Sequence, residues 1–188
     1  RQIRILAEIM RLRRACCNPK LIDQALNISS SKEQVFSEVV DELLGGGHKA
    51  LVFSQFTGHL ALLRRFLEEK KVSYRYLDGS TAAAQRQRQV EEFQAGEADF
   101  FLISLKAGGL GLNLTAADYV IHMDPWWNPA VEDQAADRAH RIGQTRPVTV
   151  YRLVTADTIE EKIVRLHQEK RTLPQSLLEG ADASARFS

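Results

Sequence analysis

The chain has 188 residues, 44% of them hydrophobic, which is enough to bury the core of a single domain. Lys and Arg total 25 against 24 for Asp and Glu, so the net charge of +1 gives no overall sign of a nucleic-acid, membrane or acidic-substrate partner. The apolar runs are far shorter than the roughly 20 residues that cross a bilayer, and the Arg-rich start lacks the apolar block of a secretory signal, so we expect a soluble protein without a membrane partner.

The first part of the chain predicts two helices. Residues 3–17 place apolar side chains at helical spacing with arginines between them, and Pro19 ends this pattern. A polar stretch at 27–31 precedes a second helical pattern, which stops at the three glycines that begin with Gly45. We assign residues 1–31 to a helical lead-in segment.

Beyond the glycines, short apolar runs alternate strictly with helical patterns. This alternation predicts an α/β fold, with a mainly parallel, doubly wound sheet and helices on both faces, over residues 32–156. Residues 157–188 predict a C-terminal helix that braces the domain, followed by a frayed tail. The expected strands are 49–54, 73–77, 100–104, 119–123 and 148–154, and the expected helices are 58–70, 82–95, 130–141 and 158–179.

Polar turns follow the first two expected strands, where a parallel sheet binds its ligands. Ser54 and Gln55 end the first strand, and Gly79 and Ser80 follow the second. Hydroxyls and free backbone N–H groups at the start of a helix can hold an anion such as a backbone phosphate. Ordinary helix caps and turns use the same residues, so both interpretations stay open.

A glycine-rich loop follows Ser104 at the end of the third strand. Gly109 and Gly111 begin a dinucleotide-binding fingerprint, but Leu114 occupies the position of its third glycine, which makes a Rossmann cofactor site a weak hypothesis. The chain also lacks the G-x-x-x-x-G-K-[ST] phosphate loop. If the protein binds a nucleotide, its principal phosphate loop lies elsewhere.

Two adjacent tryptophans follow the fourth strand, between Pro125 and Pro129. Indole rings at the mouth of a sheet can stack against nucleic acid or pack beneath the next helix. We expect Trp126 to pack in the core, and for Trp127 both interpretations stay open.

The expected helix 130–141 carries Gln134, Arg138 and Arg141 at positions i, i+4 and i+7, on one helical face. Two guanidiniums on one face suit phosphoryl transfer, where positioned arginines stabilise charge on the γ-phosphate. The alternative is a solvated face on which Asp137 pairs with Arg141.

The residues that commonly bind metals show no metal-site spacing. Cys16 and Cys17 are adjacent, which suits neither a disulfide nor a full zinc site, and we expect both to be reduced thiols in a cytosolic or nuclear protein. The five histidines are also spaced unlike zinc ligands, so we assign no metal to the chain itself.

Together these segments resemble the second RecA-like lobe of the Swi/Snf-family ATPases, in helicase superfamily two. The resemblance is carried by KALVFSQF (49–56), YLDGST (76–81), LISLKAGGLGLNLTAADYVIHMDPWWNP (102–129) and QAADRAHRIGQTRPVTVYRLVTADTIEEKI (134–163). RLRRACCNPKLI (11–22) resembles the segment that leads into this lobe. The double tryptophan and the compact spacing are more similar to those of bacterial members and the ubiquitin-ligase-associated subgroup than to those of large nucleosome remodellers. Tyr76 stands where many members have arginine, so we expect no charged contact there.

The resemblance implies roles for individual residues. Arg138 and Arg141 match the arginine fingers that reach the γ-phosphate of ATP held by the first lobe. The positions that match the rest of the ATP site are Gln134, Gly109, Gly111 and Asn113. The positions that match DNA-backbone contacts are Ser54, Gln55, Gly79, Ser80, Ser104, Trp127 and Asn128.

The resemblance also implies the C-terminal motor lobe of a DNA-dependent ATPase that translocates along double-stranded DNA, in the manner of a chromatin remodeller. ATP with Mg²⁺ would be held mainly by a first lobe outside this sequence, so we expect the fragment alone to be inactive. Its expected partners are DNA, that first lobe and a DNA-bound protein to be remodelled. The expected location is the nucleoid-associated cytoplasm of a bacterium, or the nucleus in a eukaryote. A strand-separating helicase lobe and a non-enzymatic nucleic-acid-binding module remain as alternatives.

Overall fold

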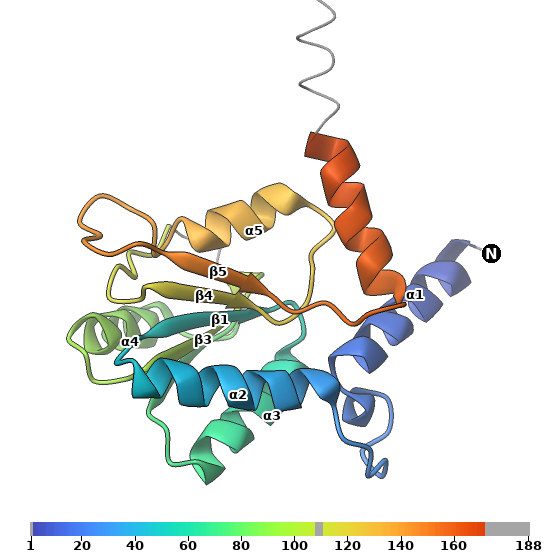
Figure 1. Cartoon of the computed structure of the whole chain (residues 1–188), viewed down its shortest axis with the longest axis horizontal. Coiled ribbons are helices and arrows are strands. Elements are labelled where there is room, and N and C mark those ends of the chain that lie inside the picture. The colour runs from blue at the N-terminus through green and yellow to red at the C-terminus, as the bar shows by residue number, and fades with distance from the viewer. Residues whose placement is uncertain (1, 108–110, 172–188) are drawn as a thin grey trace, which may run out of the picture.

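The computed structural model describes residues 2–107 and 111–171, which fold around one five-stranded sheet (Figure 1). All strand pairs are parallel, and the strand order is β2-β3-β1-β4-β5. The elements along the chain are α1 (Gln2–Cys17), the 3-10 turn η1 (Pro19–Leu21), α2 (Ser31–Gly45), β1 (Ala50–Ser54), α3 (Thr57–Glu69), β2 (Tyr74–Leu77), α4 (Ala83–Gln94), β3 (Phe100–Ser104), β4 (Tyr119–His122), α5 (Pro129–Ala136) and β5 (Thr149–Arg152), and a last helix covers 159–171.

The central strands β1 and β3 are buried on both faces of the sheet, and successive residues along a strand point to opposite sides. Leu51 and Phe53 of β1 pack in one cluster with residues of α4 and α5. Ala50 and Val52 pack in the other cluster with residues of α2 and α3. Each large apolar side chain buried in this way stabilises the fold by about 2 kcal/mol. The predicted α/β fold with a doubly wound parallel sheet is confirmed.

The register of the strands brings their carboxyl ends to one edge of the sheet. Ser54 of β1 pairs with Ser104 of β3, and Phe53 of β1 pairs with His122 of β4. The segments that follow these strands therefore emerge next to one another, which places the predicted site residues along a single edge.

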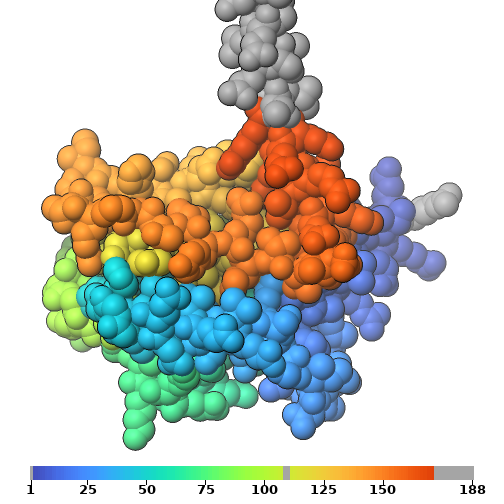
Figure 2. Space-filling model, in the orientation of Figure 1, coloured from blue at the N-terminus to red at the C-terminus, as the bar shows by residue number. Residues whose placement is uncertain are grey.

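The segments at the two ends of the described chain lie side by side. The hydroxyl of Thr155, between β5 and the last helix, donates to the carbonyl of Cys16 in α1 at 3.1 Å. Figure 2 shows the last helix beside the N-terminal segment. The last helix is described over 159–171, and the remainder of the predicted helix, 172–179, lies outside the described residues.

The predicted helix 130–141 is wrong in its second half, because α5 ends at Ala136. Asp137 caps the helix, and the chain then turns so that the Arg138 carbonyl accepts a hydrogen bond from the backbone N–H of Leu114 at 2.9 Å. Arg138 and Arg141 therefore do not share a helical face with Gln134. No helix within the described residues is long and apolar enough to span a bilayer.

Candidate functional site

Arg138 is a buried cation whose side chain is incompletely paired. Its side chain is 5% exposed, and Nε and Nη1 have no hydrogen-bond partner among the described residues. Burial, together with the nearby charge of Arg141, lowers the pKa of Arg138 to about 10. The guanidinium carbon lies 5.9 Å from the centre of the Phe53 ring. Because an unpaired buried charge is costly, this group suits an anion that approaches from outside the lobe.

Arg141 is exposed and connects two loops. Its Nη1 donates to the carbonyl of Gly111 at 2.7 Å, and its Nε donates to the main-chain carbonyl of Asp137 at 3.0 Å. The alternative ion pair with the Asp137 carboxylate is thus replaced by a main-chain contact. Gly111 has a φ of +55°, a left-handed conformation that favours glycine.

The structure brings part of the predicted ATP site together. Asn113, Asp137 and Arg141 line one open depression, and Gly111 is bonded to its arginine. Gln134 lies exposed on α5, before the turn that carries Arg138 and Arg141. Gly109 lies outside the described residues. Arg141, Gly111 and Asn113 therefore form the compact part of the site, and the buried Arg138 lies close enough to Arg141 for the charge of Arg141 to lower its pKa.

Three predicted DNA-contacting residues meet at a second depression. Gln55, Ser104 and Trp127 line it, together with Arg13 and Lys106. Gln55 is largely buried, and its Nε2 has no partner among the described residues. The unpaired amide and the exposed Lys106 make this depression suitable for an anionic ligand.

Ser54 does not line this depression. The residue is fully buried, and its hydroxyl donates to the Asp124 carboxylate, while the backbone N–H of Gln55 donates to the other carboxylate oxygen at 3.3 Å. The pKa of Asp124 is raised, mainly because the carboxylate is buried. A direct phosphate contact by the Ser54 hydroxyl would require this bond to break, so the structure shows Ser54 shaping the turn.

Gly79 and Ser80 are exposed in the turn after β2, at the edge of the sheet. The backbone N–H and hydroxyl of Ser80 both donate to the Asp78 carboxylate, at 2.8 and 2.6 Å. Hydrogen bonds from Ser80 and Tyr76 lower the pKa of Asp78. The turn is therefore held by its own carboxylate, and it does not line the depression that contains Trp127.

The two tryptophans have different surroundings. Trp126 is half-buried and packs against the core, as the sequence predicted. Trp127 is also half-buried, but its ring faces the guanidinium of Arg13. Asn128 caps α5, because its side-chain oxygen accepts from the backbone N–H of Ala130 at 3.1 Å.

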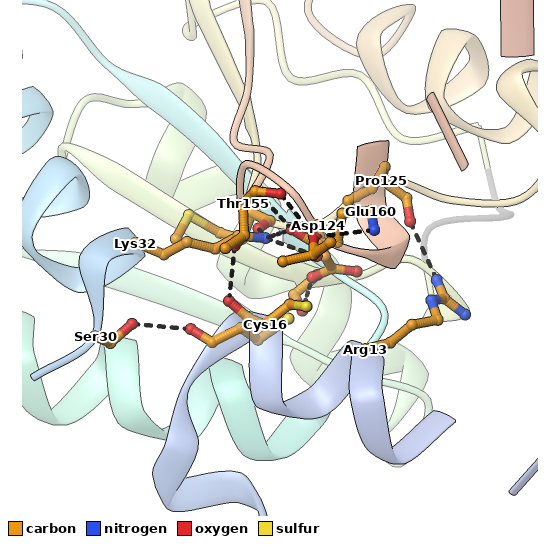
Figure 3. Close-up of polar contacts among 12 residues, drawn as sticks. Arg13, Cys16, Ser30, Lys32, Asp124, Pro125, Thr155 and Glu160 are labelled. Carbon is orange, nitrogen blue, oxygen red and sulfur yellow. Dashed lines mark hydrogen bonds and ion pairs between the residues drawn. The ribbon is translucent and has the colours of Figure 1, made fainter. Parts of the chain in front are cut away.

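Sequence reasoning missed a buried polar network behind the strand ends (Figure 3). Lys32 of α2 donates to the Met123 carbonyl at 2.6 Å and pairs with Glu160 of the last helix at 2.7 Å. Ser30 donates to the Cys17 carbonyl at 3.0 Å. The network joins α1, α2, the end of β4 and the last helix. Lys32 looked like an ordinary surface lysine in sequence, because its partners lie about a hundred residues away.

One group of potential metal ligands lies within this region. Ligand atoms of Cys17, His59 and Asp124 all lie within 4.8 Å of one another, and all three residues are buried. Both Asp124 oxygens already accept hydrogen bonds from Ser54 and Gln55. Burial lowers the pKa of His59 to about 3 and raises that of Cys17, which keeps both groups neutral. We assign no metal here, and the absence of a bound metal stays a prediction.

Comparison with known proteins identifies the family of this arrangement. Residues 31–143 match the helicase conserved C-terminal domain. The human lymphoid-specific helicase is 43% identical over 92% of the chain, and the mouse chromatin-remodeling ATPase INO80 is 42% identical over 85%. The chain spans 22% of the first of these proteins and 10% of the second.

Solved structures give the same picture. The Sulfolobus solfataricus SWI2/SNF2 ATPase core in complex with double-stranded DNA aligns with a TM-score of 0.77 and 36% identity, over 90% of this chain and 36% of that one. The C-terminal part of the Fun30 ATPase domain aligns with a TM-score of 0.71 and 36% identity, over 84% of this chain and 53% of that one.

Proposed function

Since the chain belongs to the helicase conserved C-terminal domain family, as a Swi/Snf-type C-terminal ATPase lobe, we propose that it is the second motor lobe of an ATP-dependent double-stranded DNA translocase. Remodeller ATPases among its relatives support this proposal, as does the structural neighbour whose core was solved with double-stranded DNA. The activity of the whole protein is part of the proposal, because this chain spans only a fraction of its relatives.

The observation that carries the proposal is the unpaired guanidinium of Arg138. A self-contained domain has little reason to bury a cation whose N–H groups have neither a counter-ion nor hydrogen-bond partners, because the desolvation cost is large. A half-site that closes over an anion does have a reason, since the anion restores the missing interactions. A γ-phosphate would supply the hydrogen-bond partners that Nε and Nη1 of Arg138 lack, and its charge would also be balanced by the nearby Arg141.

Arg138 and Arg141 would act as arginine fingers on ATP held by a first lobe. ATP with Mg²⁺, when bound there, would supply the phosphoryl group that water attacks. Arg138 stabilises the charge that develops on the phosphate, and Arg141 couples this site to the backbone at Gly111. Gln134 and Asn113 are the further polar groups of this chain on the ATP side, with Gly109 as a family-implied position.

DNA would bind along the carboxyl ends of the strands. Gln55, Ser104 and Trp127 line the depression there, with the turn at Gly79–Ser80 farther along the edge and Asn128 at the start of α5. Backbone N–H groups and small polar side chains contact phosphates without reading the base sequence. This explains how a chain with a net charge of +1 can belong to a DNA motor. In a eukaryote the expected location is the nucleus, and in a bacterium the nucleoid-associated cytoplasm.

The decisive experiment measures ATP hydrolysis by this chain alone and by a protein that carries both lobes, each with and without duplex DNA. The chain alone should be inactive, and the two-lobed protein should be stimulated by DNA. Arg141→Ala in the two-lobed protein should remove the stimulated hydrolysis while DNA binding persists. Arg146→Ala is the matched control, because Arg146 is an exposed arginine that pairs with Asp118 before β4.

Two results would contradict the proposal. The first is hydrolysis by the chain alone that survives Arg138→Ala. The second is unchanged turnover of the Arg141→Ala protein. A triplex-displacement assay beside a fluorescent unwinding assay separates translocation from strand separation, and unwinding would favour the helicase alternative.

A further inference from the structure

The loop that carries the two tryptophans is held from the lead-in helix by Arg13. Arg13 lies in α1 and is 2% exposed, and its Nη2 donates to the carbonyl of Pro125 at 3.1 Å (Figure 3). Its guanidinium carbon lies 5.0 Å from the centre of the Trp127 ring and 5.9 Å from the Trp126 ring. A cation at this distance from an indole attracts the ring face and fixes its orientation.

No ion pair accounts for the burial of Arg13. Among the described residues Arg13 forms no salt bridge. Burial is the largest influence on the pKa of Arg13, and it lowers that pKa. Asp124 and Glu160 oppose this shift through their charges alone. The direct partners of the guanidinium are therefore the loop carbonyl, the methionine sulfur one turn earlier in α1, and aromatic rings.

The last helix holds the same loop from its other end. The ring of His167 bonds to the Trp126 carbonyl, and Nζ of Lys170 donates to the Trp127 carbonyl at 3.4 Å. Three successive carbonyls, from Pro125 to Trp127, thus each accept from a different basic side chain. His167 and Lys170 hold the backbone of the loop through these carbonyls. Arg13 bonds to a carbonyl too, but it also contacts the indole ring of Trp127.

We propose that Arg13 is a positioning residue that orients the Trp127 ring for contact with DNA. The inference rests on the proposed function, since it concerns the same depression at the strand ends, where Arg13 and Trp127 are both lining residues. Arg13 acts through the ring and the loop carbonyl, so its effect on DNA should depend on the presence of that ring.

The first test uses the two tryptophans as reporters, because they are the only ones in the chain. Arg13→Met keeps the length of the side chain but removes its charge and donors. It should shift the tryptophan emission to longer wavelength and increase quenching by acrylamide. Arg13→Lys should restore part of the change, and Arg11→Met is the control, because Arg11 is exposed in the same helix and does not line the depression. Unchanged emission in a folded Arg13→Met protein would overturn the inference.

The second test is a double-mutant cycle in a protein that carries both lobes. Arg13→Met should raise the DNA concentration for half-maximal ATPase by about fivefold, with kcat at saturating DNA nearly unchanged. Trp127→Leu should raise it too, and Arg13→Met should add nothing further in that background. Additive effects would show a general structural role and overturn the inference. Failure of the proposed function is distinct, because the unmodified protein would then show no DNA stimulation.

Discussion

The ammonium of Lys32 lies 2.7 Å from the carboxylate of Glu160, in a buried ion pair that joins the start of α2 to the last helix. The two side chains are 4% and 1% exposed. Removing one partner of such a pair leaves an uncompensated buried charge. We predict that Lys32→Met lowers the free energy of unfolding by about 3 kcal/mol, measured by urea denaturation.

The matched control is the ion pair between Lys70 and Asp41, which has a similar length but lies at the surface. Lys70→Met should change the free energy of unfolding by less than about 0.5 kcal/mol. Lys32→Met combined with Glu160→Gln should cost less than the sum of the single changes, because the second change removes the stranded charge. Equal losses at both pairs would contradict the structural role of Lys32.

A second prediction separates the effect of Arg138 on the stability of the lobe from its role in ATP hydrolysis. Replacing an unpaired buried guanidinium with an apolar side chain of similar length removes a desolvation cost. We predict that Arg138→Met stabilises the isolated lobe by about 1 kcal/mol in urea denaturation. In a protein with both lobes, the same change should abolish DNA-stimulated ATP hydrolysis.

Arg141→Met is the control for this prediction. Arg141 is exposed and donates to two main-chain carbonyls, so its replacement should not stabilise the lobe. Both variants should lose stimulated hydrolysis, but only Arg138→Met should raise stability. A destabilised Arg138→Met lobe would mean that the guanidinium has partners within the fold.

The third prediction concerns acid stability. Burial lowers the pKa of His122 to about 4 and that of His59 to about 3, against an ordinary value of 6.5. Both rings are neutral in the fold, and the unfolded chain binds the extra protons below pH 6.5. Their contribution to stability is therefore present above pH 6.5 and is lost as the pH falls toward 4. Each histidine should account for about 2 kcal/mol between pH 7 and pH 5.

His122→Phe isolates one of these contributions, because the ring stacks on Phe53 and an aromatic replacement retains that packing. The raised pKa of Asp124 acts in the opposite direction, but it is common to both proteins. Urea denaturation at pH 7 and pH 5 should show a loss that is about 2 kcal/mol smaller in the variant. The same pH dependence in both proteins would contradict a neutral, buried His122.

The sheet was predictable from the sequence because its strands are continuous apolar runs that are too short to form ordinary helices. The end of α5 was not predictable in the same way. Residues 130–141 hold good helix formers, yet the helix stops at Ala136, and just beyond it the Arg138 carbonyl bonds to Leu114, which is distant in sequence. Local propensity alone therefore does not set the end of this helix.

The candidate site was predictable as a set of motifs but not as a geometry. The segments around Ser54 and Trp127 were found at strand ends, and the structure places Gln55, Ser104 and Trp127 around one depression. Arg13 and Lys32 were missed as buried residues, because charged side chains are usually exposed and their partners lie 112 and 128 residues away. Only the folded chain reveals such pairings.

The attachment of both flanking segments to one loop has a mechanical consequence. A pull between α1 and the last helix can pass from Arg13 through Pro125 and Trp126 to His167, along a few hydrogen bonds. This route runs beside the direct hydrogen bond between Thr155, just before the last helix, and Cys16 of α1, and neither passes through the ladder of the five-stranded sheet. Tension between the two flanking segments would therefore be shared by the tryptophan loop and this hydrogen bond.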